Sequence, residues 1–143
     1  MGLGELVDKF FPIIGIVLLI VVNIFLRKRR AERTPVEICA RLLADVDYNH
    51  SLTENFQFNP KVGKFKTGGW QRNRNKIDFL DPALQSLLAS AFSMAESANR
   101  DVDASRKYKT ASYLSGIDVR KLKEYMAKSK QGLEEWFQAN ATQ

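Results

Sequence analysis

The pattern of apolar and polar positions divides the chain into one unbroken apolar run and a longer amphipathic part. The run covers residues 10–26, and Asn23 is its only polar side chain. A helix needs about 20 predominantly apolar residues to cross the hydrocarbon core of a bilayer. The run therefore predicts a transmembrane anchor at residues 10–28, preceded by a short extracytoplasmic segment at residues 1–9.

The charges that flank this run predict its orientation. Glu5 and Asp8 precede it, whereas a cleaved signal peptide has basic residues before its apolar stretch. A basic collar at residues 29–34 follows the anchor. By the positive-inside rule, residues 35–143 then lie in the cytoplasm, at the inner face of the cell membrane. We expect five basic residues in and beside the collar to contact anionic lipid headgroups: Arg27, Lys28, Arg29, Arg30 and Arg33.

Three stretches of the remaining chain repeat apolar residues at the spacing of an amphipathic helix. Each follows a helix-start signal: Thr34 before a proline and a glutamate, Asp81 before a proline, and Asp118. The helices are expected at about residues 35–56, 82–106 and 118–139. Three helices of this length can bury one core. The predicted fold is all-α, with one N-terminal transmembrane helix and a small cytoplasmic bundle.

The segment between the first two predicted helices, residues 57–80, has no helical period and contains three glycines. It is predicted to be a loop, with a short hairpin as an option. From residue 56 to residue 76 it carries six basic side chains, no carboxylate and two interleaved aromatic residues. The candidates for binding an anion or a partner are Lys61, Lys64, Phe65, Lys66, Trp70, Arg72, Arg74 and Lys76.

Two interpretations of this basic loop remain open. Its cations could neutralise phosphates while its aromatic rings stack on bases or enter the headgroup layer. Alternatively, Phe65 and Trp70 cover the end of the helical core, and this simpler interpretation is preferred. Lipid contact also meets a geometric difficulty. An upright helix over residues 35–56 would carry the loop roughly 30 Å from the anchor, whereas headgroup attraction fades within about 8–10 Å.

Charge is concentrated near the anchor. Residues 27–76 contain twelve basic and five acidic side chains, whereas residues 77–143 contain nine of each. This asymmetry indicates an anionic partner or surface near the first half of the chain. We expect anionic lipid as that surface. Nucleic acid is less favoured, because no recognised binding motif is present.

The residues that could support catalysis do not form a recognisable set. Gly63 and Gly68 have the first spacing of a phosphate-binding loop, but Gly69 and Trp70 stand where lysine and serine or threonine are required. His50 is the only histidine, and no second metal ligand or nucleophile accompanies it. We therefore predict no cofactor, no metal and no enzymatic activity, and a hydrolase or metal enzyme centred on His50 is the least favoured hypothesis.

The function predicted from sequence is a membrane-anchored, non-enzymatic adaptor or accessory subunit that offers its helical domain to a protein partner. The alternative is a peripheral anion-binding module in which residues 56–76 contact anionic lipid or nucleic acid. The two hypotheses differ in salt dependence, because contacts to phosphates weaken steeply as salt rises.

Overall fold

The computed structural model describes residues 18–22 and 34–141. The chain forms two compact units, Met1–Thr34 and Pro35–Gln143. In the first unit the described residues are 18–22, which are helical, and Thr34, which directly precedes the second unit. Within these two described stretches, no helix combines the length and the apolar character needed to cross a bilayer. Most of the predicted anchor at residues 10–28, and all five basic residues predicted to contact headgroups, lie outside them.

The second unit is built from helices, and the described residues contain no strand. Its elements are α2 (Pro35–Glu54), α3 (Gly68–Asn73), α4 (Pro82–Lys107), the 3-10 helix η1 (Ala111–Leu114) and α5 (Val119–Asn140). The all-α prediction is confirmed. The three long helices agree closely with the predicted ranges. The prediction that residues 57–80 contain no helix is wrong, because α3 lies within them.

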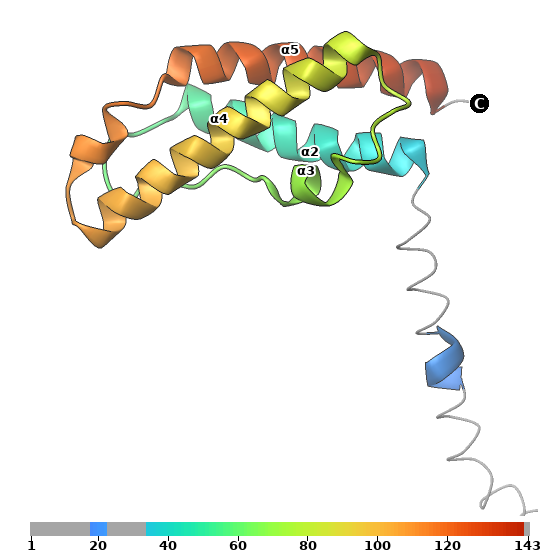
Figure 1. Cartoon of the computed structure of the whole chain (residues 1–143), viewed down its shortest axis with the longest axis horizontal. Helices are drawn as coiled ribbons and strands as arrows, with labels where there is room; N and C mark the ends of the chain where they lie inside the picture. The colour runs from blue at the N-terminus through green and yellow to red at the C-terminus, as the bar shows by residue number, and fades with distance from the viewer. Residues whose placement is uncertain (1–17, 23–33, 142–143) are drawn as a thin grey trace, which may run out of the picture. The chain divides into compact units, whose positions relative to one another are not determined.

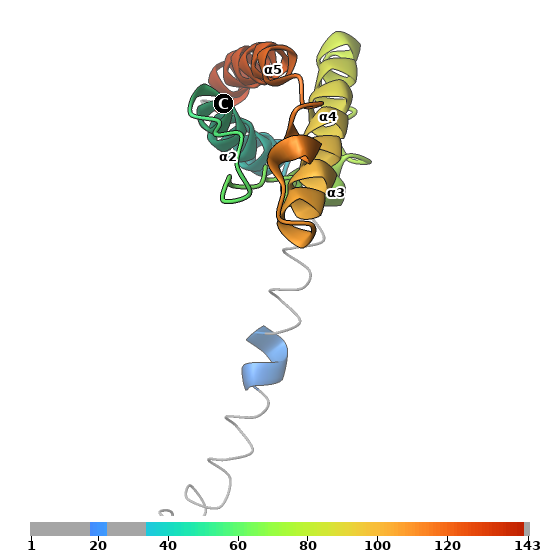
Figure 2. The same cartoon turned by 90° about the vertical axis from the view of Figure 1, so that its left-hand side faces the viewer.

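The three long helices run side by side, with α2 and α4 in the same direction and α5 opposite to both (Figure 1). We call the end of the domain where α2 and α4 begin the proximal end. There the Cys39 thiol lies 3.4 Å from the carbonyl oxygen of Leu133, near the end of α5. We call the opposite end, formed by residues 55–63 and 104–117, the distal end. Figure 2 views the domain from this distal side.

The core lies where α5 packs against both α2 and α4. Each long helix contributes an apolar stripe at three- and four-residue spacing, as the sequence pattern predicts. The fully buried side chains include Leu42, Val46, Leu88, Phe92, Ala95, Leu122, Met126 and Leu133. The half-buried Trp136 and Phe137 pack against this cluster, and the ring of Trp136 lies 4.7 Å from that of Phe79.

The helix starts follow the predicted signals, although one cap differs in detail. Asp118 caps α5, because its carboxylate accepts a hydrogen bond from the backbone N–H of Lys121 at 3.0 Å. Asp81 occupies the N-cap position of α4 and a proline follows it, but its side chain makes no capping hydrogen bond. The fixed backbone angle of Pro82 therefore contributes to starting this helix.

Candidate functional site: the crossover segment and the distal end

The link between α2 and α4, residues 55–81, is a crossover segment that returns along both helices to the proximal end (Figure 1). Two asparagines hold its middle. The side-chain amide of Asn49 on α2 donates to the carbonyl of Lys66 at 2.8 Å and accepts from its N–H at 2.7 Å. Asn99 on α4 does the same for Phe65, at 2.9 and 2.7 Å. Each asparagine thus replaces the partner that a neighbouring strand would provide.

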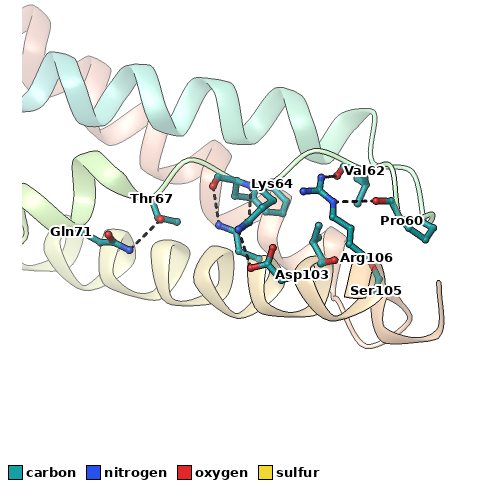
Figure 3. Close-up of polar contacts among 11 residues, drawn as sticks. Pro60, Val62, Lys64, Thr67, Gln71, Asp103, Ser105 and Arg106 are labelled. Carbon is teal, nitrogen blue, oxygen red and sulfur yellow. Dashed lines mark hydrogen bonds and ion pairs between the residues drawn. The ribbon is translucent and has the colours of Figure 1, made fainter. Parts of the chain in front are cut away.

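Charged groups fix the part of the crossover segment that precedes the residues held by this asparagine pair. Arg106 donates to the carbonyls of Pro60 and Val62, at 3.2 and 2.6 Å (Figure 3). Lys64 forms an ion pair with Asp103 at 3.0 Å (Figure 3). Polar contacts to α4 therefore follow the extended part of the crossover segment along its course.

The short helix α3 is fixed by a close approach of its backbone to α2. The N–H of Gly69 donates to the carboxylate of Asp45 at 3.1 Å, and the Asn73 side chain donates to the Gly69 carbonyl at 2.8 Å. A Cβ atom at position 69 would collide with the Asp45 carboxylate. Glycine is required here by the space available, and not by its backbone angle, which is not positive.

This arrangement corrects the predicted role of the two aromatic residues of the basic loop. Phe65 is 4 % exposed and Trp70 is 8 % exposed, and both belong to the core. The Trp70 ring stacks on Phe92 with the centroids 5.3 Å apart. Neither ring is available to stack on a base or to enter a headgroup layer. The preferred alternative, in which both rings cover the helical core, matches their positions.

The six predicted basic candidates divide into three groups. Lys64 and Lys66 in the middle have partners: Lys64 pairs with Asp103, and the Lys66 ammonium lies 4.2 Å from the Tyr48 ring centroid. Lys61 is exposed at the distal end. The remaining three are exposed on or just after α3, and none of them forms an ion pair with another described residue: Arg72, Arg74 and Lys76.

The return course of the crossover segment also changes the expected distance from the start of the domain. Gly69 packs against Asp45, ten residues after Pro35. At 1.5 Å per residue, this contact lies only about 15 Å along α2. The three exposed cations follow this contact along the chain, so they lie between the middle of α2 and the proximal end, where the chain enters the domain. The 30 Å separation expected for the whole loop applies only to the distal end.

Exposed aromatic side chains gather at the distal end. Phe58 is 53 % exposed, Tyr108 57 % and Tyr113 41 %. The rings of Tyr108 and Tyr113 stack at 5.4 Å, and the Lys107 ammonium lies 5.4 Å from the Tyr108 ring centroid. Phe58 packs edge-on against the half-buried Phe56 at 4.9 Å. These rings are held in place by neighbours while much of their surface meets solvent.

Beneath these rings, a small second core closes the distal end. Val62 of the crossover segment, Val102 of α4 and Leu114 of η1 are buried against one another. The connection between α4 and η1 passes through Lys109, whose φ angle is 53°. The turn is closed by a hydrogen bond from the N–H of Thr110 to the carbonyl of Ser105 at 3.1 Å. This is the left-handed helix end that glycine usually occupies, so the turn holds a lysine at some conformational cost.

The sequence contains a signal for this distal surface in two stretches without carboxylates. Residues 104–117 include Arg106, Lys107 and Lys109, with two tyrosines and no carboxylate. Residues 55–63 likewise contain no carboxylate, and they include Lys61 and Phe58. The two carboxylate-free stretches are far apart in sequence, and only the return of the crossover segment to α4 joins them.

His50 and Cys39 have side chains of types that often take part in catalysis, but their contacts here are structural. His50 lies 3.8 Å from Glu54, one turn later on α2. No group of three or more histidine, cysteine, aspartate and glutamate side chains in the described residues could hold a metal ion. Cys39 is fully buried, and this burial raises the pKa of its thiol to about 11. A thiol with such a pKa is protonated at neutral pH and therefore a poor nucleophile.

Comparison of the chain with protein families, with curated proteins and with solved structures found no match. The candidate site is therefore defined by its own geometry: a fixed crossover segment, an exposed cationic group near the proximal end, and an exposed aromatic and basic surface at the distal end.

Proposed function

We propose that the protein is a single-pass membrane-anchored adaptor, without catalytic activity, that presents its helical domain to a protein partner at the cytoplasmic face of the membrane. One observation carries this proposal. Of the four large apolar or aromatic side chains exposed in the described part of Pro35–Gln143, three lie at the distal end: Phe58, Tyr108 and Tyr113. The fourth is Tyr48 of α2, which lies beside Lys66 of the crossover segment.

Exposed tyrosine and phenylalanine in one place are typical of a binding surface. Aromatic residues are enriched at the centre of protein interfaces, where they bury a large area. Their few rotatable bonds also make the entropic cost of fixing them small. Tyr108 already has one neighbour on its ring in Tyr113 and another in Lys107. A partner would therefore meet side chains that are already ordered.

The position of this surface fits an anchored protein. The apolar run and the basic residues that follow it support an anchor before Pro35. The chain enters the domain at Pro35, the first residue of α2. The distal end lies beyond Glu54, the last residue of this helix. With 20 residues, α2 spans about 30 Å. The aromatic surface is thus at the end of the domain opposite to the residue where the chain enters it.

The test is site-specific photocrosslinking of the full-length chain in its native membrane. A benzoylphenylalanine replaces Tyr113 in one variant and Gln138, exposed near the proximal end, in the control. We expect the Tyr113 position to give one defined protein adduct that the Gln138 position does not give. Adducts of equal yield and pattern at both positions, or lipid adducts alone at Tyr113, would contradict the adaptor proposal.

A second candidate function, binding of anionic lipid, is favoured by the return course of the crossover segment. It brings Arg72, Arg74 and Lys76 near the end of the domain that follows the predicted anchor. Each basic residue close to an anionic membrane surface contributes about 1 kcal/mol. These three cations would therefore act with the basic collar, while the distal surface stays free for a partner.

The lipid contact is tested with the full-length chain in nanodiscs. A fluorophore on cysteine at position 75 labels this region selectively, because Cys39 is buried and protonated. We expect headgroup-attached quenchers to reduce its fluorescence in anionic discs more than in zwitterionic discs. Changing Arg72, Arg74 and Lys76 to Gln should remove the difference. Quenching that is independent of lipid charge would exclude this candidate.

A further inference from the structure

The distal end has an uncompensated positive charge as well as exposed aromatic rings. Its two stretches, residues 55–63 and 104–117, contain no carboxylate and four basic side chains: Lys61, Arg106, Lys107 and Lys109. All four are exposed. Arg106 donates to two backbone carbonyls, which fixes its guanidinium without neutralising it.

Three carboxylates beside this surface have contacts of their own. Glu54, at the end of α2, lies 3.8 Å from His50. Asp103, one turn before the end of α4, is paired with Lys64 at 3.0 Å. Asp118 accepts the hydrogen bond that caps α5. The four cations of the distal end outnumber these flanking carboxylates, so the surface around the three aromatic rings has a net positive charge.

The ring arrangement distinguishes between the anions that such a surface could bind. Single-stranded nucleic acid uses the free faces of aromatic rings, on which successive bases stack. Tyr113 stacks on the Tyr108 ring, and the Lys107 ammonium lies 5.4 Å from the centroid of the same ring. Phe58 meets Phe56 by an edge contact. The stack of Tyr108 on Tyr113 occupies one face of each ring, so the two rings are less available to successive bases than separate rings would be, whereas a stacked pair suits a protein surface.

We propose that the distal end binds an acidic segment of a protein partner, one that carries several carboxylates beside an apolar or aromatic residue. This inference rests on the proposed adaptor function and names the chemistry of its partner. Lys61, Lys107 and Lys109 pair with the carboxylates at the rim. Phe58 and Tyr113 contribute the apolar contact between them. Charge complementarity of this kind accelerates association and excludes basic partners.

The left-handed turn at Lys109 supports the same inference. A lysine in this backbone region is uncommon, because its Cβ crowds the following carbonyl. Glycine would close the same turn without that cost. The chain instead places a positive side chain at the tip of the distal end, beside Tyr108 and Lys107. The conformational cost is consistent with a use for this ammonium group at the surface.

The experiment measures binding of a fluorescent peptide to the full-length chain in zwitterionic nanodiscs, by fluorescence anisotropy. The probe alternates glutamate and tryptophan, and the reference peptide has glutamine in place of each glutamate. We expect saturable binding of the acidic probe and at least tenfold weaker binding of the reference. The triple variant Lys61→Gln, Lys107→Gln, Lys109→Gln should lose about tenfold in affinity, a change of about 1.4 kcal/mol.

The matched control removes the same number of charges elsewhere, through Arg72→Gln, Arg74→Gln and Lys76→Gln. We expect this variant to lose less than about twofold, because these cations lie on the proximal side of the Gly69–Asp45 contact, more than a screening length from the distal end. Equal losses in the two triple variants would show attraction to net charge and would overturn the proposal. Tighter binding of a single-stranded oligothymidine than of the acidic peptide would overturn it in favour of nucleic acid.

The aromatic contribution is tested separately by Phe58→Ala and Tyr113→Ala, which should each weaken the acidic probe by threefold or more. No effect of either change would remove the apolar part of the proposed contact and contradict the inference. The experiments distinguish a failure of this inference from a failure of the adaptor proposal. A partner crosslinked from position 113 with a yield unaffected by the charge variants would overturn the acidic-segment inference alone. Probe binding without any crosslinked partner would contradict the adaptor alone.

Discussion

The middle of the crossover segment and the distal end of the domain have similar compositions and opposite surroundings. Both mix aromatic rings with lysine and arginine. In the middle, Phe65 and Trp70 are buried and two cations have partners. At the distal end, three aromatic rings and four cations are exposed. Interleaved aromatic and basic residues therefore do not define a binding surface until their neighbours are known.

The difference originates in the helices that face the crossover segment. Asn49 and Asn99 present amides that pair with its backbone, so an extended stretch can enter the domain without leaving buried N–H and C=O groups unpaired. Residues 104–117 are not paired with asparagine side chains in this way. Their backbone groups hydrogen-bond to one another in η1 and in the turn at Lys109. The middle became core, and the distal end remained surface.

The largest expected effect separates the two regions by stability. Trp70→Ala should lower the free energy of unfolding by about 3–5 kcal/mol, because it leaves a cavity against Phe92. Tyr113→Ala, at the distal end, should lower it by about 1 kcal/mol or less. Denaturant unfolding of the full-length chain in detergent gives both values. Similar losses for the two variants would end the distinction between core and surface.

The next effect tests the asparagine contacts. Asn99→Ala should lower the free energy of unfolding by about 2–3 kcal/mol, since it leaves the N–H and C=O of Phe65 without partners. Asn55→Ala is the distal control. Its amide donates one exposed hydrogen bond to the Ser51 carbonyl at 3.3 Å, so the loss should stay within about 0.5 kcal/mol. A tolerated Asn99→Ala would mean that the crossover segment does not depend on this contact.

A third comparison uses one substitution at two glycines. Gly69→Ala should destabilise the domain by about 1–3 kcal/mol, because the new methyl group meets the Asp45 carboxylate. A Cβ atom at Gly116, at the distal end, has no neighbour within 4 Å. Gly116→Ala should therefore be neutral, or stabilising by up to about 1 kcal/mol through the unfolded state. Thermal unfolding of the paired variants measures both, and the reverse order is incompatible with the structure.

The smallest expected effect is an increase in stability. Lys109→Gly should raise the free energy of unfolding by about 0.5–1 kcal/mol, because glycine adopts a φ angle of 53° without steric cost. The same variant should bind the acidic probe more weakly. A gain in stability with a loss in binding would link the strained turn to the distal surface. A loss of stability would show that the lysine side chain supports the turn.

The sequence was sufficient for those features that depend on neighbouring residues. Helix periodicity and the signals at Asp81 and Asp118 located the long helices, because such patterns act within a few turns. The burial of Trp70 against α4 and the pairing of Phe65 with Asn99 could not be read in this way. Phe65 and Asn99 lie 34 residues apart, and the residues around each of them do not predict that the two are in contact.

The short helix and the distal surface were missed for two different reasons. The six residues of α3 are too few to show a helical period, and they begin with two glycines. Its position depends on Gly69 reaching Asp45 of α2. The first half of the distal surface lies mainly between the second and third predicted helices, where the sequence pattern predicts no element. Its second half, around Phe58, was assigned to the basic loop, and only the returning chain brings the two halves to one end.

The central claim is that the middle of the crossover segment is structural and that binding belongs to the exposed surfaces beside it. Amide hydrogen exchange of the full-length chain, followed residue by residue at the N–H groups of Phe65 and Lys66, tests this most directly. We predict protection comparable to that of the buried residues of α4, since both N–H groups donate to asparagine side chains. Exchange at the rate of an exposed loop would contradict the structural role of this segment and would make it a candidate binding loop again.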